Sequence, residues 1–371
     1  MENYFLFKLR KHSKLKIFFN ILKILILIYL FLIGIKLLGA SLKGFGSGFA
    51  EGLIQTTANP FMGLIIGILA TSIIQSSSAT TSIIVGFVAS GMLTITNAIP
   101  IVMGANIGTT ITNIIISLAH IGRKEEFQKA FPVATVHDMF NLLAVLILLP
   151  IEMKFKIIEQ LSFKLTNIFS SSGGMKFNSP LTAIVNPIVE CILTVIRYYY
   201  VIGVILGFIL VLLALKFLVD VIRSSSKGKL EVLIDGYLFS SPIKSWFLGV
   251  GLTAFVQSSS ITTSIIVPLA AAGLVNIEQV FPYMLGANIG TTITAILASL
   301  VTGSYLAIQI AICHLLFNIF GTIIWYPLKI VPIGMAKKLG NIAIKRRYIA
   351  IIYVIAVFFV FPILLLLIFR R

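Results

Sequence analysis

Long apolar stretches dominate the chain and predict helices that cross a membrane. Six stretches approach or exceed the roughly 20 apolar residues that an α-helix needs to span a bilayer. They cover residues 17–38, 98–119, 133–149, 199–218, 304–326 and 349–369, and a further candidate surrounds residues 184–196. This pattern predicts an all-α polytopic membrane protein.

A polar motif occurs twice, within two segments that match each other. Residues 60–118 align without a gap with residues 242–300. Gln-Ser-Ser-Ser begins at Gln75 and again at Gln257, and the string Gly-Ala-Asn-Ile-Gly-Thr-Thr-Ile-Thr is identical at 104–112 and 286–294. Further on, a His and an Asn four residues later occur after each segment, as His137 with Asn141 and as His314 with Asn318. Internal repeats of this kind, often inverted, are typical of secondary transporters.

The repeat divides the chain into five parts. We expect an N-terminal helix (1–40), a first repeat (41–152) with a hairpin at 60–92, a linker with one or two membrane helices (153–229), a second repeat (230–345) with a hairpin at 242–274, and a C-terminal membrane helix (346–371). An odd number of crossings between the two copies would invert the second one. The expected total is about eight membrane-spanning helices plus two hairpins.

Each Gln-Ser-Ser-Ser interrupts an apolar stretch whose two halves are too short to cross a bilayer alone. A helix, a polar break and a returning helix form a re-entrant hairpin, whose tip is tolerated only beside protein or a water-filled cavity. Serines at the tip can cap the departing helix, whose free N–H groups then favour an anion. The candidate anion-binding residues are Gln75, Ser76, Ser77, Ser78, Gln257, Ser258, Ser259 and Ser260. The alternative is that these hydroxyls bond back to their own helices or fill tight helix contacts.

Composition and charge exclude a soluble protein and a nucleic-acid-binding protein. Hydrophobic residues make up 58% of the chain and charged residues only 11%, against roughly 25% charged in soluble domains. The net charge is +17, but its lysines and arginines lie in short clusters between apolar stretches. The positive-inside rule predicts a multi-pass protein of the inner or plasma membrane with both termini in the cytoplasm.

The repeated segments are almost free of ionisable residues, and this bears on the ligand. Residues 60–119 contain no Lys, Arg, His, Asp or Glu, and residues 245–302 contain only Glu278. A site built there would be lined by hydroxyls, amides and backbone, which suit Na⁺ or an oxyanion. A multivalent anion without fixed cations nearby would be poorly compensated, because desolvating a charge is costly. Cations bound together with the anion would compensate it, which favours cation-coupled anion transport.

Three further polar residues are candidates for the site. Asn106 and Asn288 occupy the identical strings and are candidate anion-binding amides, although the glycines beside them also suit tight helix packing. Asp138 lies in an apolar segment, where an ionisable group suggests function, and shares a helical face with Asn141. Asp138 could bind a cation, or it could lie near the interface and pair with Lys129. No nucleophile–base pair, carboxylate pair or metal cluster points to an enzyme or to a cofactor other than Na⁺.

The paired motifs, together with residues 134–141 and 309–318, resemble the type II sodium-dependent phosphate cotransporters, and the short linker resembles that of a bacterial representative. The resemblance extends from about residue 34 to residue 362. It implies two inverted repeats with re-entrant hairpins, and phosphate held between the two tips. It also implies sodium ligands, and the residues matched to them are Gln257, Ser258, Thr291 and Thr294, with Thr109 nearby, and Asp138, with Asn141 on the same helical face.

Asp138 matches the acidic residue that electrogenic members of that family keep, whereas His120 and Arg123 replace a Gln and an Asp that the family carries. The expected function is therefore electrogenic sodium–phosphate symport by alternating access, with inorganic phosphate, Na⁺ and the lipid bilayer as partners and no nucleic acid. A phosphate exporter, a transporter of another oxyanion such as sulfate or arsenate, and an anion channel remain as alternatives. A homodimer is an assembly that the sequence leaves open.

Overall fold

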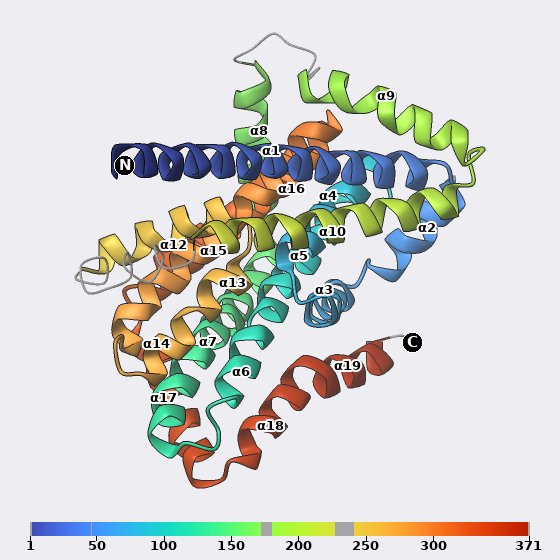
Figure 1. Ribbon diagram of the computed structural model, residues 1–371. Coiled ribbons are helices and arrows are strands. Elements are labelled where there is room, and N and C mark those ends of the chain that lie inside the picture. Colours follow the sequence, from blue (N-terminus) through green and yellow to red (C-terminus); the bar gives the residue numbers. More distant parts are fainter. Residues whose placement is uncertain (1, 46, 172–179, 227–240, 370–371) are drawn as a thin grey trace.

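A computed structural model describes residues 2–45, 47–171, 180–226 and 241–369 (Figure 1). In this part of the chain every regular element is a helix, as predicted. The predicted start of the second repeat, residue 230, and the last two residues of the predicted C-terminal helix lie outside the described residues.

Seven helices or helix pairs in the described part are long and apolar enough to cross a membrane. They are Phe19–Lys43 within α1 (Glu2–Lys43), α5–α6 (Ile95–Thr109 and Ile111–Leu118), α7 (Lys124–Phe155), Tyr200–Phe217 within α10 (Tyr200–Ser226), α15 (Ile277–Thr302), α16 (Tyr305–Trp325), and the C-terminal segment Tyr348–Phe369. That last segment comprises α18 (Tyr348–Ile355), a π-helical turn η2 (Ala356–Val360) and α19 (Phe361–Phe369). The further candidate around residues 184–196 is part of α9 (Pro180–Val195), whose apolar portion Ile184–Val195 is shorter than a full span.

The two Gln-Ser-Ser-Ser motifs break helices in the same way. The helix α3 (Pro60–Ile74) ends at Gln75, which adopts a left-handed conformation with φ 56°, and α4 (Ser77–Ser90) begins after an extended Ser76. In the second copy α12 (Pro242–Val256) ends at Gln257 with φ 59°, and a helix begins again after Ser258. The sequence therefore predicted both breaks correctly.

Helix boundaries around the breaks follow from local chemistry. Pro60 and Pro242 occupy the first position of α3 and α12, where a missing N–H costs nothing. Gly91 ends α4 with φ 81°, a conformation that favours glycine. The second returning helix is split into α13 (Ser259–Ser264) and α14 (Ile266–Ala271), because Pro268 cannot donate a hydrogen bond to the Ser264 carbonyl.

Glycines bring each helix that precedes a break into backbone contact with the helix that follows later in the same repeat. The helix α3 packs against α5 at Gly67 and Gly104, and α12 packs against α15 at Gly249 and Gly286. A Cβ atom on Gly104 would overlap the Leu64 carbonyl oxygen, and one on Gly286 would overlap the Trp246 carbonyl oxygen. These contacts support the packing interpretation of the glycines in the repeated strings.

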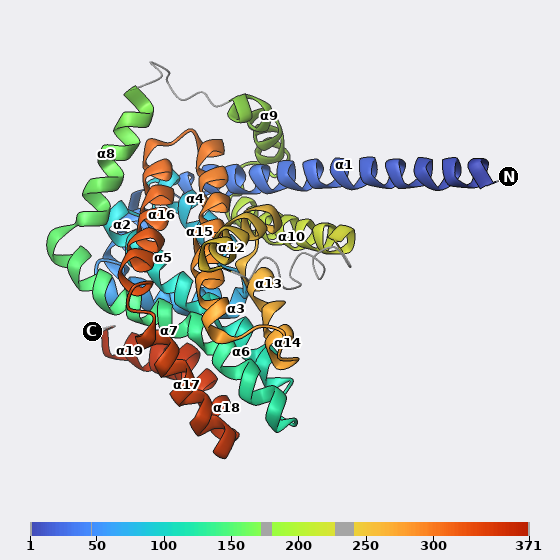
Figure 2. The same ribbon diagram turned by 90° about the vertical axis from the view of Figure 1, so that its left-hand side faces the viewer.

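The two repeats interlock at the centre of the molecule. The helix α4 of the first repeat packs against α15 and α16 of the second, and α16 also packs against α5 and α7. Outside this centre, α1 and α10 run side by side, as both views show (Figures 1 and 2). The remaining helices, α2 (Ser47–Thr56), α8 (Ile157–Ser171), α9 and α17 (Ile330–Lys345), lie around the periphery.

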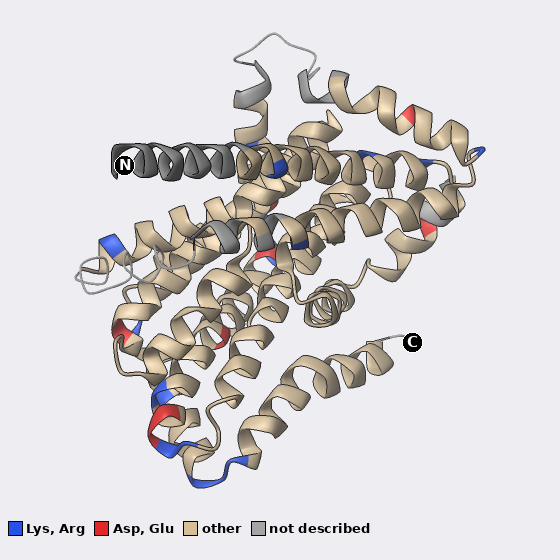
Figure 3. Cartoon of the chain, in the orientation of Figure 1, with Lys and Arg blue, Asp and Glu red and all other residues tan. Residues whose placement is uncertain are grey.

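Charged residues are few along the helices, and several of them lie close together toward the lower end of the view (Figure 3). The α6–α7 and α17–α18 connections lie at one end of the molecule (Figures 1 and 2). Here Arg123 pairs with Glu126 at 2.9 Å, and Lys337 of α17 pairs with Glu278 at 2.6 Å. The clusters of lysines and arginines in these two connections therefore lie at the same end of the molecule.

Candidate functional site

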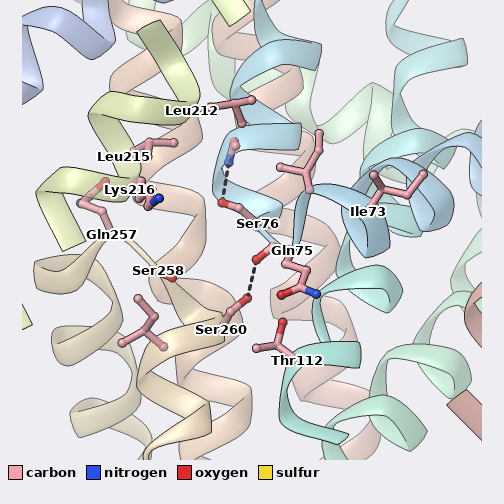
Figure 4. A pocket seen from close by; sticks show the side chains of 13 residues that line it. Ile73, Gln75, Ser76, Thr112, Leu212, Leu215, Lys216, Gln257, Ser258 and Ser260 are labelled. Carbon is pink, nitrogen blue, oxygen red and sulfur yellow. Dashed lines mark hydrogen bonds between the residues drawn. The ribbon is translucent and has the colours of Figure 1, made fainter. Parts of the chain in front are cut away.

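The two broken segments meet tip to tip through a pair of crossed hydrogen bonds. The Ser78 hydroxyl donates to the Gln257 carbonyl oxygen at 2.9 Å. The Ser260 hydroxyl donates to the Gln75 carbonyl oxygen at 3.5 Å, a bond that Figure 4 shows. Ser78 and Ser260 are matched positions of the repeat, and so are Gln75 and Gln257. The contact is therefore approximately two-fold symmetric, with each tip bonded to the other.

A cavity of about 590 Å³ lies at this junction. Its polar lining residues are Gln75, Ser76, Thr112, Lys216, Gln257, Ser258 and Ser260, and its walls are otherwise apolar (Figure 4). Of the eight Gln and Ser residues at the two breaks that were predicted to bind an anion, five line the cavity. The other three, Ser77, Ser78 and Ser259, are buried in the first turns behind it.

The serines at the two breaks are in different hydrogen-bonding states. Ser76 Oγ accepts a hydrogen bond from the Ala79 N–H at 3.2 Å and so caps α4. Ser258 is the matched residue, but its hydroxyl makes no cap bond although it lines the cavity. The Ser258 hydroxyl is therefore available to a ligand without loss of a helix cap.

The lining is not neutral, which contradicts the expectation of a site without fixed cations. Lys216 belongs to α10, outside both repeats, and it lines the cavity beside Gln257 (Figure 4). Sequence reasoning missed it because the search for charges covered only the repeated segments. The signal was present, since Lys216 is a lysine within the apolar stretch 199–218.

Each repeat places a Gln and a Thr beside the cavity, and the two are hydrogen-bonded to each other in the second repeat but not in the first. Thr294 Oγ1 donates to Gln257 Oε1 at 2.7 Å, so the structure brings these two predicted sodium ligands together. The matched hydroxyl in the first repeat, Thr112 Oγ1, is buried, has no hydrogen-bond partner among the described residues, and lines the cavity near the Gln75 amide (Figure 4). Sequence reasoning did not select Thr112, although its match to Thr294 could have identified it.

The other two predicted threonine ligands bond back to their own helices. Thr109 Oγ1 donates to the Ala105 carbonyl and Thr291 Oγ1 to the Ala287 carbonyl, each at 2.9 Å. Both side chains are buried and neither lines the cavity. Their oxygens keep lone pairs for a ligand, because each hydroxyl is a donor in these bonds.

The two asparagines of the identical strings lie in a buried network that crosses between the repeats. His137 Nε2 is 2.6 Å from Asn288 Oδ1, and Asn288 Nδ2 donates to Asn141 Oδ1 at 2.8 Å. In the reverse direction, Asn106 Oδ1 is 3.3 Å from His314 Nε2, and Asn106 Nδ2 donates to Asn318 Oδ1 at 3.4 Å. Each repeat's asparagine thus contacts the His and Asn of the other repeat, and neither Asn106 nor Asn288 lines the cavity.

Asp138 is fully buried and is held by two hydroxyls. Thr110 Oγ1 donates to Asp138 Oδ1 at 2.8 Å, and the Tyr353 hydroxyl of α18 donates to Asp138 Oδ2. Within the described residues the carboxylate forms no ion pair with Lys129 or any other cation. Asn141 has a different partner, since its Nδ2 donates to the Asn106 carbonyl oxygen at 2.7 Å.

His120 and Arg123, the two departures from the resembled pattern, share one carboxylate near the surface. His120 Nδ1 is 2.7 Å from Glu126 Oε2, and Arg123 donates to Glu126 Oε1 at 2.9 Å. They form a local ion-pair group at the α6–α7 connection and lie apart from the residues that line the cavity.

Comparison with known proteins identifies the family. The model of the Na⁺/Pi-cotransporter family matches residues 30–176 and 192–360. Sodium-dependent phosphate transport protein 2B of Homo sapiens is 33% identical over 435 residues, which cover 90% of this chain and 63% of the relative. Protein 2A of Rattus norvegicus is 34% identical over 415 residues, covering 90% of this chain and 65% of the relative.

The chain spans less than two thirds of the length of these curated relatives. No solved structure matches it. The family match and the seven apolar helices make it a multi-pass membrane protein. The match covers both broken segments, the crossed network and Asp138, and the chain belongs to the Na⁺/Pi-cotransporter family.

Proposed function

We propose that this chain is a secondary transporter that couples inward phosphate movement to sodium. The observation that carries the proposal is the cavity between two matched tips, whose hydroxyls and amides converge from both repeats. The names of the relatives, sodium-dependent phosphate transport proteins, agree with this cargo and coupling ion. The family is one of transporters and not of enzymes.

Phosphate would be held where the tips face each other. Gln75, Ser76, Gln257, Ser258 and Ser260 line the cavity and can donate or accept hydrogen bonds. The first turn of α4 begins at the same place, and free N–H groups at a helix start favour an anion. In this proposal Ser77, Ser78 and Ser259 shape the tips, and Asn106 and Asn288 hold the helices behind them in register.

Sodium would bind where oxygens of the second tip approach α15. The Thr294 hydroxyl and the Gln257 amide oxygen are in contact, and Ser258 lies next to Gln257 in the chain. Such neutral oxygens suit a hard cation, and Thr291 and Thr109 supply further hydroxyls of the same kind. Asp138, with Asn141 on the same helix, would bind a second sodium, and the charge of that additional ion would make the transport electrogenic.

Alternating access would require the crossed tip bonds to break and re-form as the cavity opens to each side. We assign the end that carries the α6–α7 and α17–α18 connections to the cytoplasm, because lysines and arginines gather there. The C-terminal segment Tyr348–Phe369 begins at this end and crosses once, so its last residues would lie on the opposite side, against the prediction of two cytoplasmic termini. The two repeats would be inverted with respect to each other, each with a re-entrant hairpin.

Labelled phosphate uptake into proteoliposomes tests the function. With sodium, lithium or choline outside, only an inward sodium gradient is expected to drive accumulation of phosphate above its external concentration. Equal uptake in all three salts, or mere equilibration, would favour an anion channel. Sulfate or arsenate that competes better than phosphate would favour another oxyanion, and sodium-driven loss of internal phosphate would favour an exporter.

Asp138→Asn is expected to reduce the charge moved per phosphate by about one elementary charge while uptake continues, because the variant removes the carboxylate that would bind one of the co-transported sodium ions. The amide keeps the shape of the side chain and an acceptor for Thr110. Current and tracer uptake recorded together on the same proteoliposomes give this ratio. Glu126→Gln is the control, since Glu126 is on the same helix in a surface ion pair. A ratio that is the same in Asp138→Asn and wild type would remove Asp138 from the sodium ligands.

A further inference from the structure

Among the lining residues that the structure describes, one side chain in the cavity between the tips is ionisable, and it comes from outside the repeats. The lining residues from the two repeats are hydroxyl, amide or apolar, whereas Lys216 enters from α10. Leu212, Leu215 and Lys216 line the cavity together because residues three and four apart share one helical face. The helix α10 thus presents the face that carries Lys216 to the tips.

Lys216 is placed to act on a ligand rather than on the protein. In the described part of the chain its amine forms no ion pair and no hydrogen bond with another residue. Figure 4 shows the terminal nitrogen beside Gln257 and directed toward the space between the two tips. Ser258 and Ser260 of the second tip and Ser76 of the first line the same cavity.

The charge of Lys216 affects the free energy of phosphate binding in the cavity. A phosphate ion that leaves water for a mostly apolar cavity loses hydration, and nearby positive charge must compensate the loss. The interaction of two unit charges a few ångströms apart is several times stronger near a protein surface than in water. An ammonium group that is always present performs this compensation before any sodium binds.

We propose that Lys216 is a fixed-charge ligand of the transported phosphate and determines how much sodium the protein needs in order to bind it. The inference rests on the proposed function and extends it to a residue outside the repeats. Lys216 donates charge-assisted hydrogen bonds to phosphate oxygens alongside the tip serines. Phosphate therefore binds at lower sodium concentrations than it would to the repeats alone.

A structural alternative is that Lys216 extends its amine to the membrane surface. Lys216 lies near the end of the apolar part of α10, Tyr200–Phe217, and lysines near helix ends commonly reach toward the interface. The two roles differ in a measurable way. A lysine that only reaches the interface would affect neither the affinity for phosphate nor its dependence on sodium.

The test is equilibrium binding of labelled inorganic phosphate to the purified full chain over a range of sodium concentrations. Lys216→Gln is expected to weaken phosphate binding about tenfold or more at low sodium, the size expected for one charge-assisted hydrogen bond. The deficit should shrink as sodium rises. Lys216→Arg should bind as wild type does. Lys338→Gln, which removes an exposed lysine of α17, should leave binding unchanged.

A chemical rescue separates loss of charge from misfolding. In a Cys191→Ser background, which leaves only the buried Cys313, Lys216→Cys is modified with 2-aminoethyl methanethiosulfonate or with its negatively charged sulfonatoethyl analogue. The first reagent restores an ammonium group and should restore binding, whereas the second should not. Inorganic phosphate should slow both reactions, because it occupies the same cavity.

Two results would overturn the inference. One is unchanged phosphate affinity in Lys216→Gln at every sodium concentration. The other is failure of the aminoethyl group to restore binding in folded Lys216→Cys. A different result, wild-type protein that neither binds nor takes up phosphate with sodium present, would refute the proposed function itself and the inference with it.

Discussion

Ser258→Ala is expected to lower the proposed sodium-dependent phosphate uptake about 100-fold without lowering the stability of the protein, whereas Ser76→Ala is expected to lower both. The Ser258 hydroxyl lines the cavity and caps no helix, so its removal takes away only ligand contacts. A hydrogen bond to a charged ligand contributes about 1.5–3 kcal/mol. Ser76 also accepts the Ala79 N–H, and loss of such a cap costs about 1 kcal/mol.

Initial uptake rates and thermal unfolding of the purified variants give the two quantities for each protein. Ser299→Ala is the matched control, because Ser299 is a buried serine of α15 that donates to the Ile296 carbonyl and lies apart from the cavity lining. If Ser258→Ala keeps at least half of the wild-type uptake, the tip serines serve helix packing and do not bind the ligand. Equal stability of Ser76→Ala and Ser258→Ala would contradict the difference in capping.

Gly249→Ala is expected to destabilise the protein by about 3 kcal/mol or more, whereas Gly251→Ala, two residues away on the same helix, is expected to be neutral or stabilising. A Cβ atom on Gly249 would overlap the Tyr283 carbonyl oxygen of α15, and backbone cannot move aside as a side-chain end can. Overpacking of this kind commonly costs about 1–3 kcal/mol even among side chains. Gly251 faces open space, and an alanine there gains up to about 1 kcal/mol of helix propensity.

The two glycine variants are compared by the temperature at which the detergent-purified protein loses its monodisperse peak in size-exclusion chromatography. Gly67→Ala should repeat the Gly249→Ala effect, because its Cβ atom would overlap the Ile101 carbonyl oxygen of α5. Similar stability of Gly249→Ala and Gly251→Ala would show that α12 and α15 are not in backbone contact.

The repeat and the breaks were predictable because their signals are local. The left-handed conformation of Gln75, the extended conformation of Ser76 and the glycine at the end of α4 each depend on a few neighbouring residues. The number of spanning helices was less predictable, since α9 is apolar over only Ile184–Val195 and contains Pro187. Composition alone does not separate such a helix from a full span.

The site was predictable only as far as the repeats extend. Matching the two copies identified Gln75, Ser76, Gln257 and Ser258, all of which line the cavity. Helical periodicity shows which residues share a face but not which helix lies opposite. Tyr353 and Asp138 are more than 200 positions apart, and no motif or spacing in the sequence predicts that they are in contact.

The crossed pairs of histidine and asparagine have a consequence for how such a chain could arise. Asn106 is bonded by His314 and Asn318, and Asn288 by His137 and Asn141. A single copy folded alone would bury an amide and an imidazole without their partners, which costs about 1–3 kcal/mol for each group. Two copies give each asparagine its partners in the other copy, whether they are fused in one chain or associated as separate subunits. Gene duplication and fusion could therefore preserve an assembly that two separate half-length chains had already formed.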